Sequence, residues 1–149
     1  MYGFVDRPID ELCGSSRFLL WAMRAWTSAV ERRMCPPHAL TPTFSRLCLM
    51  PMLPPFHTAM ALLNRDGLAN IVFAPIGHAR IMEDEAIMLA LWRNATLGRR
   101  DRCRDTLELL VDHASIAPAE AAIAAGAAAL RATGRGPMDL PQASLRRAK

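Results

Sequence analysis

The apolar positions in the first third of the chain repeat with the period of a helix. Four of them are three or four residues apart: Leu19, Met23, Trp26 and Val30. This spacing puts them on one helical face, whereas Arg24 falls on the side that we expect to face water. The pattern predicts a helix over 15–34 that Pro36 ends, because proline cannot continue a helix. Its broad apolar stripe predicts the most buried element, with Leu19 and Trp26 in the core.

Prolines divide the middle of the chain into short elements. Thr41 can cap a helix in which Pro42 takes the first position, where proline is tolerated. Pro55 opens a further helix, and Gly67 closes it. The β-branched and aromatic residues of 70–73 predict a very short strand or an extended connector.

Between Glu83 and Gly134 the pattern predicts a succession of helices. Its periodicity predicts helices over 83–97 and 101–114. His113 would then lie near a helix C-terminus, where the helix dipole favours a cation. An alanine-rich helix starts at Pro118 and stops at Gly134.

These segments predict an all-α fold, a single compact bundle of five to six helices with at most one very short strand. A chain of 149 residues is long enough for one buried core. We expect one helical domain over 1–134 and a flexible C-terminal tail over 135–149. No apolar window reaches the roughly 20 residues of a membrane span, and the first residues carry acids where a signal peptide needs bases. We therefore expect a cytoplasmic protein.

The chain is mildly basic, with a formal net charge of +4. All but one of its 18 basic residues are arginine, and the acids are interleaved with them, so no long run of one sign appears. The densest basic group is Arg99, Arg100, Arg102 and Arg104. Asp101 and Asp105 interrupt it. A solvated turn between two helices is the favoured interpretation, and a nucleic-acid-binding regulator is an alternative.

Three consecutive acids, Glu83, Asp84 and Glu85, stand shortly after His78. Carboxylates beside a histidine suggest acid–base or metal chemistry. Successive helical residues point about 100° apart, however, so the three cannot converge on one point. Acids are also favoured in the first turn of a helix by its dipole. We interpret them as a helix start. No motif of a known catalytic class appears elsewhere, so the sequence predicts a non-enzymatic protein without a cofactor.

Cysteines and histidines offer a second alternative, a metal-binding or redox-sensing protein. Cys35 and His38 have the two-residue gap that metal ligands often use. Zinc needs four ligands, usually as two such pairs. Cys48, His57 or His78 would have to complete the site. A buried free cysteine is the commoner outcome.

The run over 47–56 contains ten residues without a charge. Broken by prolines, such a segment cannot turn every side chain inward, so we expect Met50, Met52 and Leu53 to stay exposed. Exposed apolar patches usually mark contact sites, and a symmetric dimer is the commonest soluble oligomer. The favoured function is thus a small helical interaction or regulatory module that binds another protein or a second copy of itself.

The order of "RFLLWAMRAW", "NIVFAP" and "GHARIMEDEAIMLAL" resembles a family of small helical alphaproteobacterial proteins that form a domain of unknown function. The resemblance covers Arg17 to Gly134. The matching positions before and in the acidic helix are Pro75, Arg80, Asp84 and Glu85. The family's cysteine positions and its helix cap are replaced here by Ile76, Gly77, His78 and Met82. The resemblance implies that this chain has lost whatever those cysteines bind, and it implies a fold rather than an activity.

Overall fold

The computed structural model describes residues 5–134, which form six α-helices and two short 3-10 helices without a strand. The α-helices are α1 (Gly14–Glu31), α2 (Pro36–Arg46), α3 (Leu53–Asp66), α4 (Glu83–Thr96), α5 (Arg100–Leu110) and α6 (His113–Ala132). The 3-10 helices are η1 (Ile9–Glu11) and η2 (Met50–Met52). The predicted all-α bundle is confirmed. The predicted tail over 135–149 lies outside the described residues.

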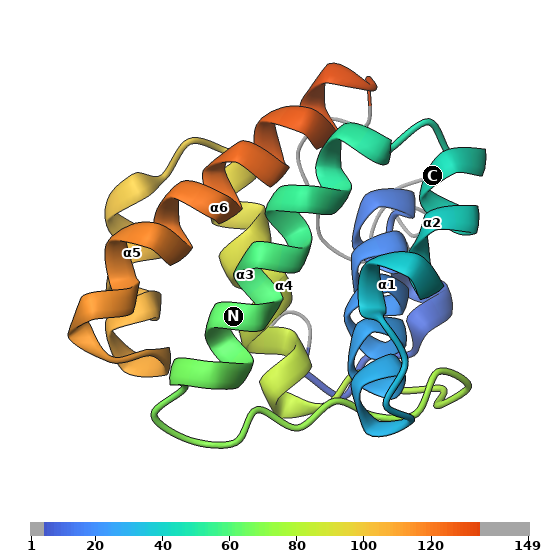
Figure 1. Cartoon of the computed structure of the whole chain (residues 1–149), viewed down its shortest axis with the longest axis horizontal. Helices are drawn as coiled ribbons and strands as arrows, with labels where there is room; N and C mark the ends of the chain where they lie inside the picture. The colour runs from blue at the N-terminus through green and yellow to red at the C-terminus, as the bar shows by residue number, and fades with distance from the viewer. Residues whose placement is uncertain (1–4, 135–149) are drawn as a thin grey trace.

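The helices form two groups that meet at α3 (Figure 1). α1 and α2 pack against each other on one side, while α4, α5 and α6 pack together on the other. α3 contacts α6 along its length and also touches α1 and α2. No helix within residues 5–134 is long and apolar enough to cross a membrane.

The core confirms the apolar stripe predicted for the first helix. Leu19 is fully buried, and Trp26 is 4% exposed. α1 is not uniquely central, because half of its residues and half of those of α4 are buried. Trp92 of α4 is the largest fully buried side chain.

Pro36 follows the end of the first helix as predicted, but the two helix starts predicted at Pro42 and Pro118 were wrong. Pro36 begins α2 directly, because the first turn of a helix needs no N–H there. Thr41 is therefore not a cap but lies inside α2, where its hydroxyl donates to the carbonyl of Pro37 at 2.7 Å. Pro42 and Pro118 likewise lie inside helices.

The start of α6 also differs from the prediction. The helix begins at His113, so this histidine is at a helix N-terminus rather than a C-terminus. Asp112 is the cap, and its carboxylate accepts from the backbone N–H of Ser115 at 3.1 Å. An aspartate satisfies a free N–H at this position.

Four of the ten residues in the uncharged run over 47–56 are buried, and the predicted exposure was wrong for two of three residues. Met52 is fully buried and Leu53 is 5% exposed, whereas Met50 is 39% exposed. The turn η2 makes the difference, because it tucks Met52 against α6 and leaves Met50 outside.

The connection over 67–82 joins α3 to α4 without a helix or a strand. Its residues 70–73 form an extended connector rather than the short strand. Connections longer than about 12–15 residues without regular structure are uncommon and usually functional. This one runs along the lower edge of the molecule beneath α1 in Figure 1.

Candidate functional site: a buried ion pair and the cleft beside it

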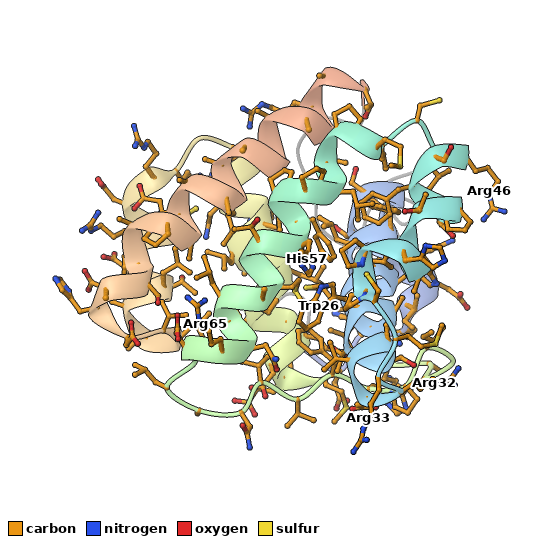
Figure 2. All side chains as sticks on the ribbon, in the orientation of Figure 1. Trp26, Arg32, Arg33, Arg46, His57 and Arg65 are labelled. Atoms are coloured by element: carbon orange, nitrogen blue, oxygen red, sulfur yellow. The ribbon has the colours of Figure 1, made fainter. Side chains whose placement is uncertain are left out.

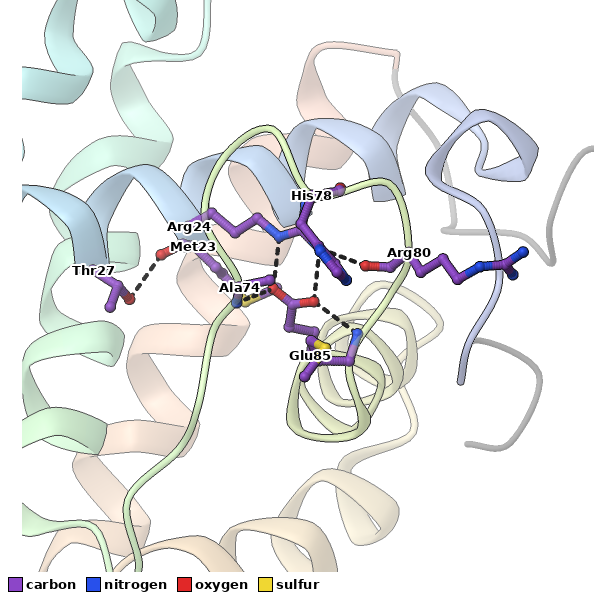
Figure 3. A network of polar contacts seen from close by, with 8 residues as sticks. Met23, Arg24, Thr27, Ala74, His78, Arg80 and Glu85 are labelled. Carbon is purple, nitrogen blue, oxygen red and sulfur yellow. Dashed lines mark hydrogen bonds and ion pairs between the residues drawn. The ribbon is translucent and has the colours of Figure 1, made fainter.

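A buried ion pair joins α1 to the start of α4. The Nε–H of Arg24 donates to Oε2 of Glu85 at 2.6 Å, and its Nη2 donates to Oε1 at 2.8 Å (Figure 3). Arg24 is 2% exposed and Glu85 is fully buried. Two parallel bonds from a planar guanidinium to a carboxylate fix both groups in one geometry.

The connection over 67–82 is folded around this ion pair. Arg24 also donates to the backbone carbonyls of His78 and Arg80, both at 2.8 Å. Glu85 accepts the backbone N–H of Ala74 at 3.0 Å and that of Met82 at 2.8 Å. Figure 3 shows these bonds converging on the pair from both sides of the loop. The pair therefore satisfies four backbone groups of an irregular segment, which buried peptide groups require.

A second carboxylate holds the same connection further along. Oδ2 of Asp84 accepts the backbone N–H of Val72 at 2.7 Å. The acids at the start of α4 thus do more than suit the helix dipole: Asp84 and Glu85 fix the loop before the helix, and Glu83 is exposed.

The sequence interpretation placed Arg24 on a solvated face and missed this role. Its partner is 61 residues away, so no local spacing reveals the pair. The helical neighbours of Arg24 three and four residues on, Thr27 and Ser28, are polar, so the pattern along the helix is that of a solvated face and gives no signal of the buried pair.

Beside the ion pair, α1, α3 and the connection enclose a cleft of about 230 Å³. Its apolar lining includes Trp26 from α1, Met60 and Leu63 from α3, and Phe73 from the connection. Its polar lining includes Thr27, Glu31, Asn64 and Asn70. The wall at Phe73 lies between Val72 and Ala74, the two residues whose N–H groups are held by Asp84 and Glu85. The acidic helix start therefore positions one wall of the cleft.

A tryptophan–histidine contact fixes the floor. The indole Nε1–H of Trp26 donates to Nδ1 of His57 at 3.0 Å. Figure 2 shows the two side chains meeting between α1 and α3. Because Nδ1 accepts, the neutral imidazole carries its proton on Nε2.

A neighbouring hollow of about 310 Å³ shares Thr27, Glu31 and Phe73 with the cleft. Ser28, Arg32 and Ile76 are among the other residues lining it. Two large apolar side chains that line these cavities are exposed, Val30 of the cleft at 37% and Ile76 of the hollow at 48%. Val72 lines neither cavity, but it lies on the same connection between the lining residues Ile71 and Phe73 and is 55% exposed.

The structure does not bring the predicted metal ligands together. Cys35 precedes α2 and Cys48 follows it, so a helix of 11 residues separates them by roughly 16 Å at the usual helical rise. His57 is bonded to Trp26, while His38 and His78 are exposed. Within residues 5–134 no three Cys, His, Asp or Glu side chains are grouped as a metal site needs.

The fourth cysteine, Cys103, is buried. Desolvation raises the pKa of its thiol, and the charge of Glu120 raises it further. A thiol in this setting is a poor nucleophile, because the thiolate is the reactive form.

The four arginines of the predicted basic group all lie exposed at the start of α5. Arg104 lies 3.3 Å and Arg100 lies 3.7 Å from the carboxylate of Glu120 on α6. Arg100 and Arg104 thus share one negative charge, which leaves Arg99 and Arg102 as the side chains most available to a phosphate.

Comparisons with models of protein families, with curated proteins and with solved structures found no match to this chain. The resemblance to the alphaproteobacterial family stays a prediction from sequence, and the functional argument rests on the geometry of the cleft.

Proposed function

We propose that this chain is a non-enzymatic helical interaction module and that it binds a partner protein through the cleft between α1, α3 and the 67–82 connection. The observation that carries the proposal is the exposure of Val30 on the cleft and of Ile76 on the adjoining hollow, around an apolar floor. Val72, exposed between the lining residues Ile71 and Phe73, adds apolar surface on the same connection. Isolated exposed apolar residues are ordinary, but several around one concavity are typical of a contact site.

The size of the cleft favours a protein partner over a free ligand. Sites for drug-sized molecules usually have about 300–1,000 Å³, and this cleft has about 230 Å³. That volume suits one anchoring side chain, while the exposed Val30 beside it and Ile76 in the adjoining hollow offer apolar surface to neighbouring residues of the partner. Protein interfaces are commonly organised around a few anchors in this way.

The polar groups of the cleft support binding rather than catalysis. Glu31, Asn64 and Asn70 line it, and none of these is a nucleophile with a base beside it. His57, the nearest histidine, already accepts a hydrogen bond from Trp26 at its Nδ1.

Paired surface variants test the proposal. Val72→Asp places a charge on the exposed side of the connection, between Ile71 and Phe73 that line the cleft, while the backbone N–H of residue 72 can still donate to Asp84. Leu109→Asp on α5, at 77% exposure, is the matched control away from the cleft. Tagged wild type and both variants are used for affinity capture from the native cells, with circular dichroism to check folding. We expect Val72→Asp alone to lose a partner.

The same three proteins are compared by light scattering. Loss of a dimer in Val72→Asp alone would identify the partner as a second copy of the chain. Capture of the same proteins by both variants, together with an unchanged molecular mass, would contradict the proposal.

A further inference from the structure

The cleft contains one charged side chain, and that charge is unopposed. Glu31 is the only ionisable residue among those that line it. Within residues 5–134 the Glu31 carboxylate has no ion pair or side-chain hydrogen bond. Arg24 and Arg32 line the neighbouring hollow, which Glu31 also lines, but Arg24 is paired with Glu85 and no ion pair joins Arg32 to Glu31. Arg33 lines neither cavity.

A partner that covers the cleft also covers the carboxylate of Glu31 and removes water from it. Glu31 is exposed in the free chain, so water solvates it now. An occupant removes part of that water, and a charge desolvated without a counter-charge is strongly unfavourable. The desolvation of Glu31 would therefore weaken the binding of a neutral apolar anchor. A cationic group would instead compensate for the lost water by attracting the carboxylate.

The rest of the lining suits a cation on an aliphatic stem. Trp26 and Phe73 supply aromatic rings, which attract cations through their faces. Asn64 and Asn70 supply amide oxygens that can accept from an ammonium or guanidinium group. Met60 and Leu63 contribute apolar surface of the kind on which lysine and arginine pack their methylene groups.

We propose that the anchor entering the cleft is a basic side chain, the aliphatic cation of a lysine or arginine of the partner, with Glu31 as its counter-ion. The inference rests on the proposed function for the identity of the partner as a protein. The chemistry of the anchor follows from the charge and the lining of the cleft.

Hexylammonium is the probe for this chemistry, and hexanol is its neutral analogue of similar length. The full chain labelled with ¹⁵N is titrated at low salt, and the indole N–H signals are followed by NMR. Trp26→Phe assigns the Trp26 signal. We expect hexylammonium to shift that signal in a saturable manner and hexanol to bind several-fold more weakly.

Glu31→Gln should weaken hexylammonium binding by about fivefold, as loss of a partly screened ion pair does, and should leave hexanol unaffected. Glu108→Gln, an exposed acid on α5, is the matched control and should change neither. Equal binding of the two probes, or no effect of Glu31→Gln, would overturn the inference while leaving an apolar binding cleft. Failure of the Val72→Asp capture experiment with hexylammonium still bound would overturn the proposed function alone. No shift of the Trp26 signal with either probe would overturn the inference as well.

Discussion

The two ends of α4 are held in the bundle by opposite means. At its first turn, Glu85 is buried in an ion pair with Arg24. Two turns later, Trp92 is buried among apolar groups, with Phe56 of α3 at a ring distance of 6.0 Å. What differs is the neighbour. The first turn faces an irregular connection whose peptide groups need partners, whereas Trp92 faces helices that satisfy their own.

The apolar end depends on shape. A Cβ placed on Gly126 of α6 would come within 2.9 Å of Cη2 and Cζ3 of Trp92, so only glycine leaves room for the indole. One polar group in this contact is unsatisfied: the buried Nε1–H of Trp92 has no hydrogen-bond partner among the described residues. A helix–helix contact thus tolerates one unsatisfied donor, while the loop contact satisfies four backbone groups with one ion pair.

The largest expected effect is at the polar end. Glu85→Ala leaves the guanidinium of Arg24 buried without its counter-charge and frees the N–H groups of Ala74 and Met82. Breaking a buried pair in this way costs about 3–5 kcal/mol, a large share of the total stability of a domain. Urea denaturation measures the loss. Glu83→Ala, an exposed acid in the same helical turn, is the control and should cost at most about 1 kcal/mol. Equal losses for the two variants would contradict a special role for the ion pair.

The next largest effect is expected at another apolar contact, where Met52 of the run over 47–56 is buried beside α6. Met52→Ala removes a fully buried side chain beside α6 and should cost about 2–5 kcal/mol. Met50→Ala changes an exposed neighbour in the same turn and should stay within about 0.5 kcal/mol. Thermal and urea unfolding of both variants check this. A loss for Met50→Ala as large as that for Met52→Ala would mean that η2 is oriented differently.

A smaller effect is expected where α6 approaches Trp92. Gly126→Ala overpacks the contact, which should lower the free energy of unfolding by about 1–3 kcal/mol. The higher helix propensity of alanine should raise it by about 1 kcal/mol. Since Trp92 is fully buried and cannot move aside, we expect a net loss of up to about 2 kcal/mol. Gly14→Ala at the start of α1 has no heavy atom within 4 Å and should stabilise by about 0.4–1 kcal/mol. A stabilised Gly126→Ala variant would show that the indole has room to shift.

The comparison also explains what the sequence could and could not predict. Leu19 and Trp26 were placed in the core correctly, because helical periodicity is a local property of the chain. Arg24 and Glu85 were not paired, because their meeting depends on how a connection without periodicity folds back on α1. The cleft was missed for the same reason, since one of its walls is that connection.

Proline gave a different kind of error. Pro36 was correctly predicted to follow a helix, but the same residue also starts the next one. Met52 was predicted to be exposed because three prolines break its segment, yet the turn that they form directs it inward. Proline limits which backbone shapes are open, and tertiary packing decides among those that remain.

The smallest expected effect concerns a carboxylate that, unlike Glu85, is reached by water. Asp66 at the end of α3 accepts the hydroxyl of Ser115 on α6 at 2.7 Å and is also bonded to Arg65. The hydrogen bonds from Arg65 and then from Ser115 lower the pKa of this carboxyl in the folded chain. The folded state therefore binds fewer protons than the unfolded state in the acid range.

Its contribution to stability is present above the ordinary pKa of aspartate, about 3.9, and is lost as the pH falls through the lowered value. Asp66→Asn should accordingly lower stability slightly at neutral pH, where the contribution of the carboxylate is present, because the uncharged amide can still accept from Ser115 but no longer pairs with the charge of Arg65. The variant should approach the stability of the wild type in acid, so its unfolding is less sensitive to pH below about 4. Urea midpoints measured between neutral and acid pH test this, with Asp105→Asn, an exposed acid on α5, as the control. If Asp66→Asn retained the full acid sensitivity of the wild type, the charge of Asp66 would make no contribution to the stability of the contact between α3 and α6. The response to acid would then come from other carboxylates.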